Sequence, residues 1–512
     1  MNFGRSISRR KMIAQSSAFA GVALVAAACS TDGVDSEALA SDAVGSAPGE
    51  TSGFPIDVAS LPDGPAAVID PATIPRGELV DFGPAPEVPD GPLSDDVAAA
   101  VETLYGQPIS GRLTNFQVTA FDTIAQSGDP RLAWLLSDHI RVWIRVAQAS
   151  GITQDFAIEV NNLLESSAGQ LTGLTFSNFE VWNPLTSALI AWDIPAPPNY
   201  LEGKRNIYVS VEPAWQALMD DNSVVDWRIV SWGGVLIDGR PFDTTDDPCN
   251  CIPAIDNPTI QTADEATWLT DDAVVFGVVV NGEARAYPRQ IMEVREMVND
   301  TLGGRDFGMP YCTLCGSAQV WFTDNLPGGI ERPVLRTSGL LSRSNKLMYD
   351  ITSNSILDTF RGTADSGSLL DAGIELEATT VVTSTWGAWV AENPDTTVLT
   401  EDLALGRNPD FRNTRDADGP IFPIGDADPR LAIQEDIFGV IQENGTPLAI
   451  HVNSASGALA RGEVVEVDGI RVLAAGDGLI AIDAQGNEVV GHQAFWFAWS
   501  QFYPSTQLWP NV

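Results

Sequence analysis

The pattern of apolar and polar positions changes once along the chain, near Trp227. Before that point apolar residues recur three and four positions apart, as on one face of a helix. The segment 94–96 (SDD) has the order of a helix N-cap followed by acids in the first turn, and Asp129 followed by Pro130 is a second start signal. The pattern predicts a small α-helical domain with repeat-like helix pairs at residues 93–228.

After Trp227 the chain consists of short β-branched runs separated by turn residues. The run 274–280 (VVFGVVV) ends at Asn281-Gly282, which is typical of a β-hairpin, and the run 230–237 ends at Asp238-Gly239. The predicted fold class is therefore α+β, with the helical domain followed by a larger, duplicated β-rich module.

The duplication is predicted from an internal repeat. The pattern W-x-A-W-x4-P-x-T begins at Trp386 and again at Trp496. Upstream, the tripeptide Phe-Gly-Val leads to Asn-Gly in both copies, with one residue inserted in the second. We predict one repeat at residues 229–400, which contains a Cys-x-x-Cys motif, and a second at 401–512, which contains no cysteine.

The N-terminus carries export signals. Arg9 and Arg10 lie in a segment that is similar to the twin-arginine export motif, and a short apolar run then ends in Ala-Ala-Ala-Cys29, which is typical of a lipobox. We expect residues 1–28 to be a twin-arginine lipoprotein signal peptide. Cys29 would carry the lipid, and residues 29–92 would form a flexible, acidic linker rich in Ala, Ser, Gly and Pro.

The predicted localisation is therefore the cell envelope, with the protein exported and anchored by its lipid on the periplasmic or external side. The formal net charge is −40, which argues against nucleic acid as a partner. The expected partners are the membrane, reached through the N-terminal lipid, and an envelope component or another protein.

Cys312 and Cys315 are the strongest candidates for chemistry. Apart from Cys29 the chain has only two other cysteines, Cys249 and Cys251. Thiolates three residues apart can share a soft metal ion, and Cys249 and Cys251 would complete a four-thiolate set for zinc or iron, whereas Met348 would suit copper. The predicted function is the binding of a soft metal at Cys312 and Cys315 for metal handling or a redox step. The alternative is a non-catalytic cell-surface binding module in which the same four cysteines form structural disulfides. Cys312 and Cys315 can also exchange disulfides with a partner.

Three further polar residues precede the motif at helical spacing. Glu296 is a candidate general acid or base, and Asn299 and Asp300 are interpreted as cap or turn residues ahead of a Gly-Gly turn. Arg343 and Arg361 are candidates to neutralise an anionic ligand. The sequence contains no G-x-S-x-G motif, Walker A loop or dinucleotide-binding glycine fingerprint.

Several motifs together resemble a bacterial family known as domain of unknown function 3179. They are residues 232–235 (WGGV), 284–288 (ARAYP), 296–300 (EMVND), 311–318 (YCTLCGSA), 338–341 (SGLL), 347–350 (LMYD) and 495–499 (FWFAW). The resemblance covers about residues 129–509 and adds Tyr349 and Asp350 to the candidate catalytic residues. It implies an architecture but no activity. Family members often have a histidine where this chain has Arg295.

Overall fold

A computed structural model of the protein describes residues 53–54, 56, 61, 63–107, 113–149, 154–176, 180–244, 249–401 and 419–511. Residues 50–512 form one compact unit. None of the described helices is long and apolar enough to cross a membrane.

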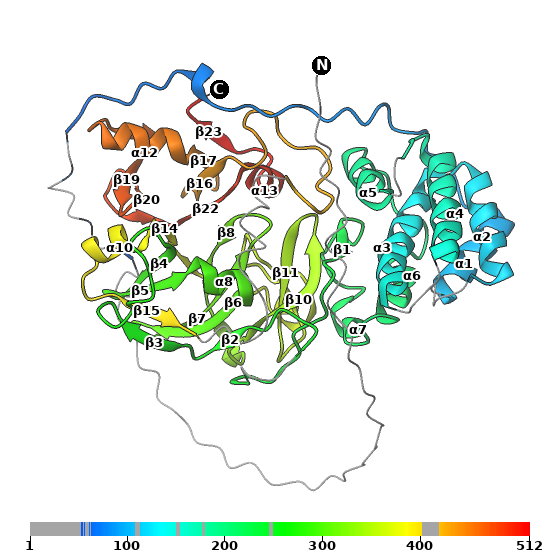
Figure 1. The fold of residues 1–512 in the computed structure, drawn as a ribbon, viewed down its shortest axis with the longest axis horizontal. Coiled ribbons are helices and arrows are strands. Elements are labelled where there is room, and N and C mark those ends of the chain that lie inside the picture. The colour runs from blue at the N-terminus through cyan, green and yellow to red at the C-terminus, as the bar shows by residue number, and fades with distance from the viewer. Residues whose placement is uncertain are drawn as a thin grey trace, which may run out of the picture. The chain divides into compact units, whose positions relative to one another are not determined.

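Every regular element that the structure describes between residues 71 and 218 is helical (Figure 1). These elements are η2 (Pro71–Thr73), α1 (Asp95–Gly106), α2 (Asn115–Ser127), η3 (Pro130–Leu132), α3 (Ala133–Ala149), α4 (Gln154–Thr172), α5 (Trp182–Ala191), α6 (Tyr200–Val209) and α7 (Trp215–Leu218). The first strand begins at Val230, so the predicted order of a helical region followed by a β-rich region is confirmed.

Local signals explain several helix ends. Thr114 and Gln117 form a capping box at the start of α2, and Gly128 ends that helix with φ of 67°. Ser94 is the N-cap of α1, as predicted, and its hydroxyl bonds to the Asp96 carboxylate at 2.6 Å. Asp129 caps the 3-10 turn η3, which leads directly into α3.

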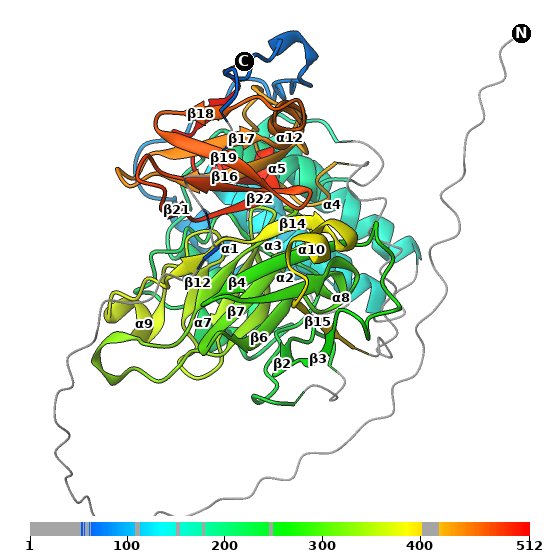
Figure 2. The ribbon, with the colours of Figure 1, turned by 90° about the vertical axis from the view of Figure 1, so that its left-hand side faces the viewer.

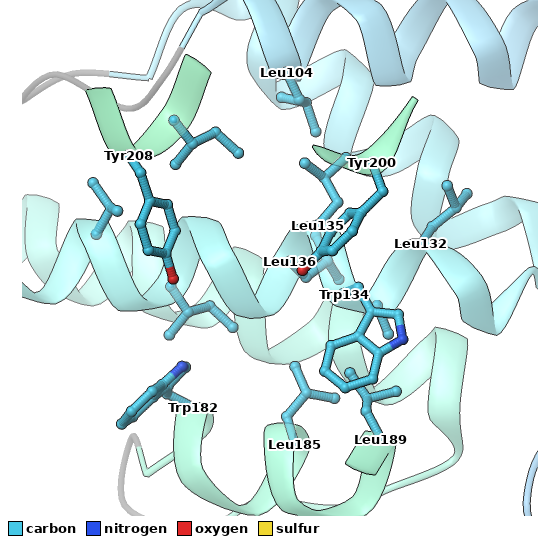
Figure 3. Close-up of a cluster of buried hydrophobic side chains, with 14 of the residues drawn as sticks. Leu104, Leu132, Trp134, Leu135, Leu136, Trp182, Leu185, Leu189, Tyr200 and Tyr208 are labelled. Carbon is cyan, nitrogen blue, oxygen red and sulfur yellow. The ribbon is translucent and has the colours of Figure 1, made fainter. Parts of the chain in front are cut away.

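The helical region has its own apolar core, part of which is shown in Figure 3. One charged pair lies within it. The Lys204 Nζ atom is 2.9 Å from the Asp138 Oδ1 atom, and their side chains are only 1% and 5% exposed. The hydroxyls of Tyr200 and Tyr208 also donate to the Asp138 carboxylate, over 2.7 and 3.1 Å. Lys204 donates to the carbonyl oxygen of Val230, which links α6 to the first strand.

The rest of the chain is dominated by strands. The strands are β1 (Val230–Trp232), β2 (Ile255–Asp256), β3 (Thr259–Thr262), β4 (Val274–Val280), β5 (Glu283–Pro288), β6 (Met297–Leu302), β7 (Arg305–Cys312), β8 (Ser317–Ala318), β9 (Val320–Phe322), β10 (Leu335–Ser342), β11 (Asn345–Asp350), β12 (Ile356–Asp358), β13 (Ala378–Thr379), β14 (Val382–Thr385), β15 (Thr397–Thr400), β16 (Asp436–Ile441), β17 (Pro447–His451), β18 (Val465–Val467), β19 (Ile470–Ala475), β20 (Gly478–Ile482), β21 (Glu488–Val489), β22 (Gly491–Phe495) and β23 (Gln507–Trp509). The helices among them are α8 (Arg289–Arg295), η4 (Pro327–Gly329), α9 (Gly367–Asp371), α10 (Trp386–Glu392), α12 (Val452–Ala460) and α13 (Trp496–Phe502).

The described strands form five sheets. Their strand orders are β1-β10-β11-β12, β13-β9-β7-β6-β2 with β8 paired to β7, β14-β4-β5-β15-β3, β22-β16-β17-β23, and β18-β19-β20-β21. The first sheet is covered on both faces. Leu347 and Tyr349 of β11 belong to the helical core, whereas Met348 between them packs with Leu335 and Leu357. This sheet therefore joins the helical region to the β-rich region.

Two of the sheets have the same order and strand directions. In β14-β4-β5-β15 and in β22-β16-β17-β23 the first two pairs are antiparallel and the last is parallel. A helix that begins at Trp386 or Trp496 precedes the last strand of each. The first strands of the two sheets, β14 and β22, lie side by side (Figure 2).

The repeated tryptophan motif has the same contacts in both sheets. Trp389 and Trp499 donate through Nε1 to Thr396 and Thr506, over 2.9 and 2.8 Å. Both rings are buried, with exposures of 0% and 1%. Each lies against a glycine of the central strand, where an added Cβ would be 2.2 Å from the ring. The repeated tryptophans therefore pack on their own sheet.

Two local predictions were wrong. Asn299 and Asp300 lie in strand β6, not in a helix or turn, because α8 ends at Arg295 and the chain reverses at Glu296. Asp238 does not form a hairpin turn. It is fully buried, and its carboxylate pairs with Arg240 at 2.7 Å. The Asn281-Gly282 hairpin between β4 and β5 is confirmed.

Candidate functional site

The Cys-x-x-Cys motif forms a tight turn at the end of β7. Cys312 is the last residue of that strand, and the N–H of Cys315 donates to the Cys312 carbonyl oxygen over 3.1 Å. Gly316 follows with φ of 60°, a conformation that glycine adopts without steric penalty. A Cβ at this position would lie 3.0 Å from the ring of Phe495, whose own N–H donates to the Cys315 carbonyl. The turn therefore requires glycine directly after the second cysteine.

The two thiols differ in acidity. Both are free and buried, with exposures of 1% for Cys312 and 0% for Cys315, and their sulfurs lie 3.8 and 3.5 Å from the Ser344 carbonyl oxygen. Burial opposes ionisation of Cys312, but a hydrogen bond from Cys315 and the charge of Lys346 outweigh it and lower the pKa of Cys312 to about 7. Burial and the neighbouring Cys312 raise the pKa of Cys315.

A buried ion pair holds the cation beside Cys312. The Lys346 Nζ atom is 2.9 Å from the Glu296 Oε2 atom, with side-chain exposures of 6% and 7%, and it also donates to the Glu296 carbonyl oxygen over 2.7 Å. Thr313, inside the motif, donates to Glu296 Oε1 over 3.3 Å. Glu296 has φ of 55°, which is uncommon for a residue with a side chain, so this position carries backbone strain.

A small cavity of about 110 Å³ opens beside this cluster. Cys312, Glu296, Thr313 and Lys346 line it, whereas Cys315 does not. The lining also includes the irregular part of β10, where the register with β11 shifts between Thr337 and Leu341, together with Gly233, Val235 and Phe422. The space is smaller than the 150 Å³ cavity that admits benzene in another protein. It therefore suits a group of a few heavy atoms.

The Phe422 ring connects this cavity to the helical region. It packs edge-on against Trp182 of α5, with ring centroids 5.9 Å apart, and the Arg141 guanidinium lies 5.2 Å from the centre of the Phe422 ring. Phe422 is partly exposed. One side chain of the cavity wall therefore depends on contacts with the helices.

The predicted four-thiolate set is not formed, because Cys249 and Cys251 are joined to each other in a disulfide. Among the residues that the structure describes, the one group of three His, Cys, Asp or Glu side chains close enough to share a metal ion is Cys249, Cys251 and Asp238. Asp238 already pairs with Arg240. This group offers metal ligands only if the disulfide is reduced.

The other predicted site residues lie apart from the two thiols. Met348 is fully buried in the apolar cluster of Leu335 and Leu357, which is separate from the cluster of Cys312 and Cys315. Tyr349 donates through its hydroxyl to the Asp238 carbonyl oxygen over 2.7 Å. Asp350 accepts the Val334 N–H over 2.8 Å. In these positions Tyr349 and Asp350 hold the backbone in place.

The two arginines suggested for an anionic ligand also bind backbone oxygens. Arg343 donates to the Ile424 carbonyl oxygen over 2.9 Å, and burial lowers its pKa. Arg361 donates to the Phe502 carbonyl oxygen over 2.7 Å. Arg9, Arg10 and Cys29 lie outside the described residues.

Sequence reasoning missed Lys346 and a second group of buried charges. Arg336, with no exposed surface, binds the Asp256 carboxylate through two nitrogens over 2.7 and 2.5 Å, and its Nε atom lies 3.7 Å from Asp238. Asn299 also donates to Asp256, over 2.9 Å. One feature of the sequence could have indicated Arg336: it is a charged residue within an apolar, strand-like run. Charged side chains are rarely buried without a partner, so such a residue predicts a buried ion pair.

Comparisons with known proteins leave the activity open. No curated protein and no solved structure matches the chain. One family model, described as "Protein of unknown function (DUF3179)", matches residues 249–485, a range that contains Cys312, Cys315, Glu296 and Lys346. The part of the chain that carries the candidate site, residues 249–485, is therefore similar to the family DUF3179.

Proposed function

We propose that Cys312 and Cys315 form a reactive dithiol that exchanges with a disulfide of a partner molecule. The observation that carries the proposal is the asymmetry of the pair. Cys312 lines a cavity and has a pKa of about 7, whereas Cys315 does not line it and has a raised pKa. A thiolate is the attacking species in disulfide exchange, and a thiol that keeps its proton until needed suits the resolving role.

The reaction balances with these two sulfurs alone. The Cys312 thiolate attacks one sulfur of the partner disulfide, a mixed disulfide forms, and the second partner sulfur leaves as a thiolate that takes up a proton. Cys315 then loses its proton and attacks the Cys312 sulfur, which releases the other partner sulfur as a thiol. The dithiol of this protein becomes a disulfide, and the partner disulfide is reduced to two thiols. The reverse reaction oxidises a partner.

Lys346 and Glu296 fit supporting roles in this proposal. The cation of Lys346 favours the thiolate form of Cys312. Glu296 balances the charge of Lys346 and fixes its position, since both its side chain and its carbonyl oxygen accept from Nζ. The cavity of about 110 Å³ admits a disulfide sulfur with its adjacent carbons rather than a large ligand.

The second candidate function is the binding of one soft metal ion by the same two sulfurs. The turn supports it, because Cys-x-x-Cys followed by a left-handed glycine brings two sulfurs to one side of the chain. Zinc and iron sites usually take four ligands, and the thiolates of Cys249 and Cys251 are used in a disulfide. Copper(I), which prefers thiolate ligands, suits a two-sulfur site better.

Titration of thiols and metal in the purified full chain separates the two candidates. In a Cys29→Ser background, the dithiol proposal expects two titratable thiols after mild reduction and their loss on incubation with a disulfide such as oxidised glutathione. It also expects a mixed disulfide that accumulates in Cys315→Ser but not in Cys312→Ser. The double variant Cys249→Ser/Cys251→Ser is the matched control and should keep this behaviour. Stoichiometric copper that disappears in Cys312→Ser, with no mixed disulfide in Cys315→Ser, would replace the dithiol proposal with metal binding.

We also propose that the protein is exported and anchored by a lipid on Cys29. Support comes from Arg9 and Arg10 and from the lipobox that ends at Cys29. Metabolic labelling with a radioactive fatty acid tests this: label should enter the wild type and be lost in Cys29→Ser. An unlabelled wild type would contradict the proposal. In this setting an envelope component or an exported protein is the expected disulfide partner.

We infer that the β-rich region contains a duplicated unit. The two sheets with matching strand orders, the repeated tryptophan motif and the equal approach of a glycine to each tryptophan support this. Only one copy contains the Cys-x-x-Cys motif. The cysteines are therefore an addition to a common scaffold in this interpretation.

A further inference from the structure

A second cavity, of about 490 Å³, is separate from the cysteine site. Its walls come from the strand region 319–321, from β13, and from the sheet that contains β16 and β22. It has no lining residue in common with the cavity beside Cys312. Its volume falls within the range of small-molecule binding sites.

The walls carry buried polar atoms without partners among the described residues. Gln319 is 2% exposed, and neither its amide nitrogen nor its amide oxygen has a hydrogen bond. The same holds for the hydroxyl of Thr379, which is 3% exposed, and for Nε2 of His492. All three residues line this cavity. Buried polar groups without partners are uncommon, and each costs free energy that a bound molecule can recover.

The unpartnered polar groups of these three residues are uncharged. Gln319 and Thr379 do not ionise, and burial lowers the pKa of His492 to about 4, so that its imidazole is neutral at neutral pH. The charged lining residues, Arg361, Glu375 and Glu377, are exposed. Glu377 is bound by Arg305 at 3.0 Å. The interior therefore favours a neutral ligand over an ion.

Aromatic rings form another part of the wall. Trp321, Phe360, Trp499 and Tyr503 line the cavity, and Tyr503 is partly exposed. Trp321 is held in place through its Nε1, which donates to the Thr359 carbonyl oxygen over 3.0 Å. These rings offer apolar surface, whereas Gln319, Thr379 and His492 offer donors and acceptors. The combination suits a molecule with C–H surface and several hydroxyl groups.

The matching sheet shows that the polar group at position 492 is not required by the fold. His492 pairs with Gly439 in one sheet, and Val382 pairs with Gly277 at the corresponding position of the other. Val382 is fully buried and packs in an apolar cluster with Trp389. An apolar valine is therefore compatible with this position of the sheet, so the fold alone does not explain why residue 492 is a histidine.

We propose that this cavity binds a neutral, polyhydroxylated small molecule of about the size of a monosaccharide. Gln319 supplies one donor and one acceptor, Thr379 supplies a hydroxyl, and His492 supplies one further donor or acceptor according to its tautomer. The aromatic rings contact the C–H surface of the ligand. The binding does not depend on the reaction proposed for Cys312.

Isothermal titration calorimetry of the purified full chain tests this proposal with D-glucose, N-acetyl-D-glucosamine and myo-inositol as probes. At least one probe should bind in the millimolar range or tighter, and Gln319→Leu, Thr379→Val and His492→Val should each weaken it by about two- to tenfold. Cys312→Ser should leave binding unchanged. Circular dichroism and thermal melting establish that each variant is folded, and Thr379→Val, which changes only the hydroxyl, carries the test if the larger changes unfold the chain.

Four results would overturn the proposal. The first is that none of the probes binds at millimolar concentration. The second is equal binding by the wild type and by the folded variants. The third is that Gln319→Leu and His492→Val raise the melting temperature, while none of the probes changes the melting temperature of the wild type. This result would indicate that the cavity holds water rather than a ligand. Binding of uracil, a planar control without hydroxyl groups, with no binding of the three polyols would also reject the proposed class.

Discussion

Replacing Lys346 with methionine tests the electrostatic account of Cys312. Lys346 is the positive charge that lowers the pKa of this thiol, and the variant removes it while keeping an unbranched apolar stem. The hydrogen bond from Cys315 remains, so the pKa should rise without returning fully to its usual value. The expected result is a slower reaction of Cys312 with small alkylating reagents at neutral pH.

The magnitude follows from the fraction of thiolate. With a pKa of about 7, half of Cys312 is ionised at neutral pH, whereas a thiol with the usual value of 9.0 is about 1% ionised. The wild-type thiol should therefore react up to about fifty times faster than an ordinary one of equal access. A single adjacent charge typically changes a pKa by one unit or more, so Lys346→Met should slow the reaction about five- to tenfold.

The assay is the rate of iodoacetamide alkylation of Cys312, followed by mass spectrometry between about pH 5 and pH 9. Mass spectrometry distinguishes alkylation of Cys312 from that of Cys315, so Cys315 and its hydrogen bond are kept in all variants, and Lys346→Arg keeps the charge as a control. Because Lys346→Met leaves Glu296 buried without its cation, Glu296→Gln/Lys346→Met is measured in parallel. A folded Lys346→Met variant with the same pH profile as its parent would refute the reasoning, as would a wild-type rate that keeps rising well above pH 7.

Three further predictions concern stability. Lys204→Met should lower the free energy of unfolding, measured in urea, by about 3–5 kcal/mol, because it leaves the Asp138 carboxylate buried without its cation. The double variant Asp138→Asn/Lys204→Met should recover part of this loss. Equal losses in the single and double variants would contradict the ion-pair account. Burial lowers the pKa of His139 to about 4 in the folded chain, whereas in the unfolded chain this histidine takes up its proton near pH 6.5. The contribution of neutral His139 to stability is therefore present above pH 6.5 and is lost as the pH falls towards 4. His139→Leu should therefore reduce the acid-induced loss by up to about 3 kcal/mol, measured by urea unfolding at both pH values, and an unchanged pH dependence would reject this cause. Gly277→Ala and Gly439→Ala should each cost about 1–3 kcal/mol, because the added Cβ would lie 2.2 Å from a tryptophan ring in both sheets, and clearly unequal costs would contradict the equivalence of the two sheets.

Much of the order of elements was predictable because its causes are local. The helical spacing before Trp227, the hairpin at Asn281-Gly282 and the Asp129-Pro130 start signal act through the backbone of a few neighbouring residues. Glu296 shows where local reading fails. The helical spacing of the acids suggested one element, but the chain leaves α8 at Arg295, passes through a left-handed residue and continues as β6.

Alone, the sequence determined the α+β order, the repeated tryptophan motif and the presence of a Cys-x-x-Cys-Gly turn, since short-range spacing and backbone preference specify them. The tertiary structure decided which side chains meet. Lys346 reaches Glu296 from a strand whose residues are all buried, so no alternation of polar and apolar positions marks it. Arg336 binds a carboxylate 80 residues earlier in the chain, and Cys249 forms a disulfide with Cys251 instead of sharing a metal ion with Cys312 and Cys315. Contacts of this kind depend on strand pairing and on the desolvation of charges in the folded chain, which sequence spacing does not specify.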